Sequence, residues 1–138
     1  MILLDTAPLV ALCDPRDNLN RRAVRDLDHF WHEALVLVTP VLTEACFLLR
    51  HAVQRARLQR LVAEFSVHAY QSEDEGRLWQ EALAWMHRYR EHEPDLADAY
   101  LVVVAGKERR SRVWTYDREF RTTWRRADGS AIPLAGGR

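Results

Sequence analysis

The apolar positions of this chain fall into short runs with β character, separated by longer segments with helical spacing. Residues 35–39 (LVLVT) are typical of the first kind, because a short apolar run rich in β-branched residues is characteristic of a buried strand. By this criterion we predict five strands, over residues 1–4, 35–39, 67–70, 113–116 and 131–135. The third of these is the weakest.

The segments between these strands have apolar residues three and four apart, which is the spacing of amphipathic helices. Helices are predicted over residues 8–13, 20–32, 40–52, 56–65, from about 73 to 90, and from 95 to about 109. Pro40 suits the first turn of a helix, where its missing N–H costs nothing. Ser72 and Glu75 have the spacing of a capping box. The helix that they begin is expected to bury Trp79, Ala82, Leu83 and Met86.

Strands that alternate with helices predict an α/β fold with a mostly parallel sheet of about five strands and helices on both faces. The expected architecture is a single-domain, three-layer α/β/α structure. A chain of 138 residues is long enough to bury a core, and we expect one domain over residues 1–138.

The stretch EPDLADAYLVVVAG (93–106) could form a strand or a helix from its apolar run alone. A helix is favoured because Asp95 follows Pro94 at an N-cap position and the pattern continues to Lys107. Capping by itself explains Asp95, although a role at a metal site stays open. Asp98, three residues later, stands where acids favour the helix dipole whatever their function.

Four acids come at equivalent places in this predicted fold. Asp5 and Asp117 follow strands, whereas Glu44 lies one turn into a helix and Asp98 lies in the first turn of another. Ligands of parallel sheets bind beyond the carboxyl ends of the strands, so we expect these four side chains to converge. The alternatives are a salt bridge to arginine for Glu44 and a turn for Asp117.

Clustered carboxylates repel one another and raise each other's pKa unless a cation neutralises them. Oxygen ligands without a His or Cys cluster favour Mg²⁺ or Mn²⁺ over zinc. Such an ion binds phosphodiester oxygens and activates water. The predicted chemistry is therefore phosphodiester hydrolysis.

Four segments carry a family resemblance, and they cover nearly the whole chain in order: DTAPLVAL (5–12), TEACFLL (43–49), DLADAYLVVVA (95–105) and TYDREF (115–120). Together they resemble the acidic motifs of the PIN-domain nucleases. The chain length is similar to that of VapC-type toxins from bacterial toxin–antitoxin pairs.

The resemblance implies an Mg²⁺- or Mn²⁺-dependent endoribonuclease that acts on RNA, usually as a homodimer and often inhibited by a cognate antitoxin. The residues that match its catalytic and metal-binding acids are Asp5, Glu44, Asp98 and Asp117. Thr115 matches a hydroxyl position of the last motif, and Thr6 matches the hydroxyl after the first aspartate. Ala7 departs from the small hydroxyl residue that the family often has there, and Pro8 is unusual in that turn.

Charge is uneven along the chain although the net charge is zero. Residues 71–98 hold eight acids and three arginines, whereas 107–126 hold eight basic residues and three acids. This distribution is compatible with a metal site beside phosphate-binding arginines, and equally with solvated helix faces. Trp124, among arginines, is a candidate for stacking on a base, whereas Trp114 is expected to be packed.

The remaining features bound the class of protein. The chain begins MILLD, which is not a signal peptide, and no apolar run reaches the roughly 18 residues of a membrane span, so a cytoplasmic protein is expected. Cys13 and Cys46 are too few and too far apart for a disulfide scaffold.

Three other functions fit less well. A receiver domain needs paired acids after its first strand and a lysine near its last strand, but Lys107 is the only lysine and is predicted to end a helix. A haloacid-dehalogenase-like phosphatase needs an aspartate where Ala7 stands. A non-catalytic PIN-like module that binds RNA or protein remains the alternative to an enzyme.

Overall fold

The computed structural model describes residues 1–136 and contains one parallel five-stranded sheet. Its strands are β1 (Ile2–Leu4), β2 (Leu35–Leu37), β3 (His68–Ala69), β4 (Arg112–Trp114) and β5 (Leu134–Ala135). The strand order is β3-β2-β1-β4-β5, and in the centre Leu3 lies opposite Val36 on one side and Val113 on the other. All five predicted strands are present.

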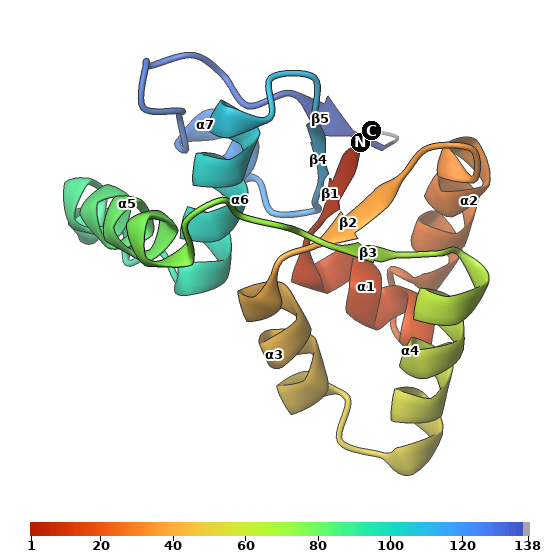
Figure 1. Cartoon of the computed structure of the whole chain (residues 1–138). Coiled ribbons are helices and arrows are strands. Elements are labelled where there is room, and N and C mark those ends of the chain that lie inside the picture. Colours follow the sequence, from red (N-terminus) through yellow and green to blue (C-terminus); the bar gives the residue numbers. More distant parts are fainter. Residues whose placement is uncertain (137–138) are drawn as a thin grey trace.

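Helices cover both faces of this sheet. They are α1 (Thr6–Cys13), α2 (Asn20–Phe30), α3 (Thr39–Leu48), α4 (Ala52–Glu64), α5 (Glu75–Arg88), the 3-10 turn η1 (Arg90–His92), α6 (Leu96–Lys107) and α7 (Glu119–Thr122). In Figure 1, α1, α2 and α4 lie on one side of the sheet and α5, α6 and α7 on the other. The predicted three-layer α/β/α fold is therefore confirmed.

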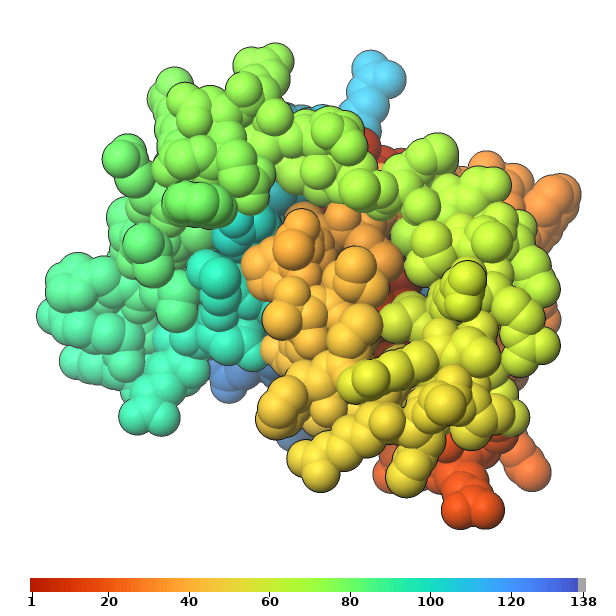
Figure 2. Space-filling view, turned by 60° about the horizontal axis from the view of Figure 1, so that its bottom comes forward, coloured from red at the N-terminus to blue at the C-terminus, as the bar shows by residue number. Residues whose placement is uncertain are grey.

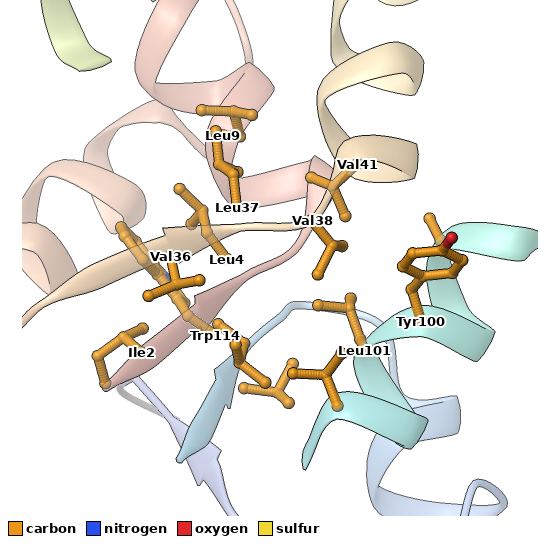
Figure 3. Packing of buried hydrophobic residues seen from close by; sticks show 14 of the residues in the cluster. Ile2, Leu4, Leu9, Val36, Leu37, Val38, Val41, Tyr100, Leu101 and Trp114 are labelled. Atoms are coloured by element: carbon orange, nitrogen blue, oxygen red, sulfur yellow. The ribbon is translucent and has the colours of Figure 1, made fainter. Parts of the chain in front are cut away.

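The core lies where α6 and α1 pack on the central strands. All of β1 is fully buried, and Figure 3 shows Leu4, Val38 and Leu101 among the side chains that fill the space between sheet and helices. Most of α6 is buried, so its apolar residues are needed on all sides of the helix. This burial anchors the first turn of α6 beside the carboxyl ends of β1 and β4.

The boundary between α3 and α4 differs from the prediction of one helix to residue 52. The helix α3 ends at Leu48, and α4 begins at Ala52 with His51 as its N-cap. Arg55 fixes this break, because its Nε donates to the Leu49 carbonyl at 2.8 Å and its Nη2 to the Cys46 carbonyl at 3.1 Å. Side-chain bonds to carbonyls that lack helical partners end α3 early.

The predicted N-cap of α5 was wrong, and its predicted inner face was right only for Ala82, which is buried, and Met86, which packs against the core. Asp74, rather than Ser72, caps the helix, accepting a hydrogen bond from the Arg77 N–H at 3.0 Å. The buried side chains of α5 are Leu78, Ala82 and Trp85, whereas Trp79 and Leu83 are exposed. The packing of α5 against α6 decides this orientation, which apolar spacing alone could not.

The remaining aromatic and cysteine predictions had mixed outcomes. Trp114 is packed as predicted, but Trp124 is only 2% exposed and lies edge-to-face against Trp85, so it is not a stacking platform. Both cysteines are free, and Cys13 is buried. Within residues 1–136, no helix is both long enough and apolar enough to cross a membrane.

Candidate active site

Asp5 lies at the centre of the carboxyl edge of the sheet, between β1 and α1. Its Oδ1 accepts a hydrogen bond from the Thr6 N–H at 2.7 Å, which makes it the N-cap of α1. Its Oδ2 accepts from the Thr115 hydroxyl at 2.6 Å. The side chain is 7% exposed, so both oxygens are held in place in a nearly dry environment.

Thr115 and Asp117 lie in the turn between β4 and α7. The Thr115 hydroxyl accepts a hydrogen bond from the Asp117 N–H at 3.0 Å while donating to Asp5. Asp117 Oδ1 accepts from the Glu119 N–H at 2.9 Å. Asp117 thus has the turn role that was the alternative interpretation, and its negative charge also acts on Asp5. Because β4 ends at Trp114, Asp117 stands three residues past the strand rather than directly after it.

Asp95 and Asp98 form a reciprocal capping box at the start of α6. Asp95 Oδ1 accepts from the Asp98 N–H at 2.8 Å, and Asp98 Oδ2 accepts from the Asp95 N–H at 3.2 Å. The predicted N-cap role of Asp95 is therefore confirmed. Since each carboxylate bonds the other's backbone, the two charged groups are held close together despite their repulsion.

Glu44 faces this pair from the second turn of α3. Burial raises the pKa of Glu44, and the nearby charges of Asp95 and Asp5 raise it further, while the Thr6 hydroxyl opposes the shift. Figure 2 views this end of the molecule, with α3 in the centre between α4 and the α5–α6 pair. The acids that the sequence predicted to converge thus surround one region.

The same interactions perturb the two central aspartates. Burial raises the pKa of Asp5 to about 6, assisted by the charges of Asp117 and Asp95 and opposed by the hydrogen bonds from Thr115 and Thr6. Burial also raises the pKa of Asp98 to about 8, and the neighbouring charges of Asp95 and Asp5 add to the shift. Crowded carboxylates without a cation hold protons at a pH where isolated ones are ionised.

In the part of the chain that the structure describes, no basic side chain forms a salt bridge with this cluster. The salt bridges among residues 1–136 use the acids Glu33, Glu81 and Asp128, none of which belongs to it. Crowded, unneutralised oxygen donors suit a hard divalent cation such as Mg²⁺ or Mn²⁺. In the conformation of the structure, no three His, Cys, Asp or Glu side chains of the described residues are grouped so that they could hold a metal ion.

Sequence reasoning underestimated Asp95. Its charge raises the pKa of Asp5, Glu44 and Asp98, so it belongs to the cluster as well as capping α6. The capping explanation concealed this second relation, because an aspartate at an N-cap needs no other reason. The missing information was that Glu44 faces Asp95, which depends on how α3 and α6 pack together.

A groove of about 670 Å³ opens beside the cluster, between α3 and the first turns of α5 and α6. Glu44 and Asp95 line one part of it. The exposed aromatic side chains Phe47 and Trp79 line another. The acidic region is therefore accessible from a broad and partly apolar surface.

With this geometry in place, comparison with known proteins identifies the class. Residues 2–124 match the PIN domain, and the chain belongs to that family. The fold resembles that of VapC20 from Mycobacterium tuberculosis, described as a sarcin-ricin loop cleaving toxin, with a TM-score of 0.69 and 24% sequence identity. The match covers 88% of this chain and 94% of VapC20. A comparison with curated proteins found no significant match.

Proposed function

We propose that this protein is a metal-dependent endoribonuclease that hydrolyses phosphodiester bonds of RNA. The observation that supports it best is the gathering of Asp5, Glu44, Asp95, Asp98 and Asp117 with no salt bridge to a basic side chain among residues 1–136. Such a cluster is unfavourable for folding, which is typical of a site kept for its chemistry. Membership of the PIN domain family agrees with this activity.

Each side chain has a distinct part in this proposal. Asp5, Glu44, Asp98 and Asp117 would hold Mg²⁺ or Mn²⁺, which when bound lowers the pKa of water and binds the scissile phosphate. Thr115 positions Asp5 through its 2.6 Å hydrogen bond. Asp95 holds Asp98 in place and adds negative charge to the site.

The biological setting that we propose is the toxin of a type II toxin–antitoxin pair, acting in the cytoplasm and inhibited by a cognate antitoxin. Residues 1–138 would form one nuclease domain. The fold relative VapC20 supports the toxin assignment. We also propose a homodimer, whose contact surface would include the exposed side chains of Phe47, Trp79 and Leu96 around the groove.

The test is cleavage of RNA by protein first stripped of metal. A sarcin-ricin loop hairpin and an unstructured single strand are suitable substrates, the first because VapC20 is described as cleaving it. We expect cleavage only after Mg²⁺ or Mn²⁺ is added. Asp98→Asn should reduce the rate at least about a hundredfold, the scale of losing one transition-state interaction.

Asp74→Asn is the matched control, since Asp74 also stands at a helix N-terminus but outside the acidic cluster. It should cleave RNA at the wild-type rate. Metal-independent cleavage, or equal rates for Asp98→Asn and wild type, would contradict the proposed site. RNA binding without cleavage under any metal would instead favour the non-catalytic PIN-like module.

A further inference from the structure

A second cavity lies between α5, α6 and the segment after α7. Its volume is about 490 Å³, within the roughly 300–1,000 Å³ of small-molecule sites. Trp85, Val102 and Val103 give it apolar walls, and Gly106 lines it without a side chain. Along α6, the lining begins one turn beyond Asp98 and continues to the end of the helix.

Arg126 lines this cavity and is 7% exposed. Its Nε and Nη2 are buried and have no hydrogen-bond partner among residues 1–136, and none of its nitrogens is in a salt bridge with them. A buried charge without a partner is strongly unfavourable. Two nitrogens of this buried guanidinium are therefore left without a partner within residues 1–136.

The other charges around the cavity do not supply that partner. Lys107 Nζ lies 2.9 Å from Glu81, and Arg109 Nη2 lies 2.6 Å from Asp128, so both lining acids already have their own cations. The lining contains four basic residues, including Arg88, but only these two acids. Its charge excess of two matches the nearly double negative charge of a phosphate monoester.

Backbone hydrogen bonds hold Arg126 at the cavity wall. Its N–H donates to the Ser130 carbonyl at 3.0 Å, and its carbonyl accepts from the Gly129 N–H at 2.9 Å. Gly129 has φ +84°, which few other residues adopt readily. The preceding carbonyl, of Arg125, accepts from Trp85 Nε1 at 3.1 Å. The backbone that carries Arg126 is thus anchored to α5 rather than part of a free loop.

We propose that this cavity binds a phosphate monoester on a compact organic body, the chemistry of a mononucleotide. The phosphate would receive paired hydrogen bonds from Arg126, which suits the fork of a guanidinium. The organic body would pack against Trp85 and Val102. Two sources share this chemistry, a free mononucleotide and the 5′-phosphorylated end of an RNA strand.

Binding is tested on the full chain by thermal shift and titration calorimetry, with AMP, adenosine and inorganic phosphate as probes. AMP is expected to raise the melting temperature, phosphate to raise it less, and adenosine to leave it unchanged. RNA oligomers with a 5′-phosphate or a 5′-hydroxyl separate the two sources. Binding of AMP indicates a free nucleotide, whereas binding of only the phosphorylated oligomer indicates an RNA end.

Two variants alter the cavity in different ways. Arg126→Met should weaken AMP binding at least about tenfold, since it removes a charged donor. It should also raise the melting temperature of the ligand-free protein, because a buried unpaired charge disappears. Gly106→Leu should block binding with Arg126 intact, because a Cβ there meets nothing within 4 Å. Gly76→Leu is its control, on α5 outside the cavity.

The inference is overturned if none of the phosphate-bearing probes binds, or if Arg126→Met lowers the melting temperature of the ligand-free protein. Binding that survives both Arg126→Met and Gly106→Leu would also overturn it. This outcome is independent of RNA cleavage, since Asp98→Asn is expected to retain AMP binding.

Discussion

Thr115 donates a 2.6 Å hydrogen bond to Asp5, 110 residues away in the sequence, and joins the turn after β4 to the end of β1. The same hydroxyl accepts the Asp117 N–H at 3.0 Å, so one small side chain positions two acids of the cluster. Because the two strands are neighbours in the sheet, this contact depends on their parallel pairing.

Thr115→Val should impair both stability and cleavage. Loss of a donor to a nearly buried carboxylate is expected to cost about 1–3 kcal/mol of unfolding free energy. It should also raise the pKa of Asp5, because the Thr115 hydrogen bond lowers it. The pH profile of RNA cleavage should therefore shift to higher pH, which a purely structural effect would not produce. Thr115→Ser retains the hydroxyl and should resemble wild type; an unshifted profile in Thr115→Val would contradict the positioning role.

Substitutions of Asp95 should separate its two roles. Asp95→Asn preserves N-capping, so stability without metal should be unchanged or higher, while removal of one charge should weaken binding of Mg²⁺. Asp95→Ala also loses the cap and should be less stable than Asp95→Asn by about 1 kcal/mol. Urea unfolding and metal titration measure the two effects. Equal metal affinity in Asp95→Asn and wild type would mean that Asp95 acts only as an N-cap and has no part in metal binding.

Without metal, the unfolding free energy should fall as the pH rises from about 4 to about 8. The pKa values of Asp5, about 6, and Asp98, about 8, exceed the roughly 4 of an unfolded aspartate. The folded protein therefore binds more protons in this range, and stability present below pH 4 is progressively lost above it. Since one pKa unit corresponds to about 1.4 kcal/mol, we expect a loss of several kcal/mol, measured by urea unfolding in a chelator.

Asp98→Asn should flatten this dependence, because an amide cannot titrate, and Asp74→Asn should leave it intact. Addition of Mg²⁺ at pH 8 should return to the wild-type protein the stability that it loses without metal, since a ligand that binds only the folded state stabilises that state. A wild-type curve that rises from pH 5 to pH 8 without metal would contradict the crowding of these carboxylates.

Trp79→Ser should convert the proposed homodimer into a monomer. Trp79 is 57% exposed beside the groove, where burial in a partner would stabilise association. Trp31, which is 71% exposed just after α2, provides the matched control, and Trp31→Ser should remain dimeric. Sedimentation velocity measures both. Dimers that persist in Trp79→Ser would place the contact elsewhere, and a monomeric wild type would remove the homodimer altogether.

Much of the fold could be predicted because it rests on local patterns. The apolar run before Asp5 predicted β1, and the N-cap at Asp95 distinguished α6 from a strand. Boundaries that depend on distant contacts were missed. At the end of α3, Arg55 bonds the carbonyls of Cys46 and Leu49. The helix α5 buries Trp85 rather than Trp79 because of its packing on α6.

The sequence by itself determined an α/β protein with Asp5, Glu44, Asp98 and Asp117 at equivalent ends of its elements, since strand and helix signals lie within a few residues. Only the tertiary structure decided that Asp95 also faces Glu44, and that two buried nitrogens of Arg126 have no hydrogen-bond partner among residues 1–136. Both depend on which side chains of separate elements meet. Three-dimensional packing determines which charges pair and which are buried, and the periodicity of one chain does not reveal either.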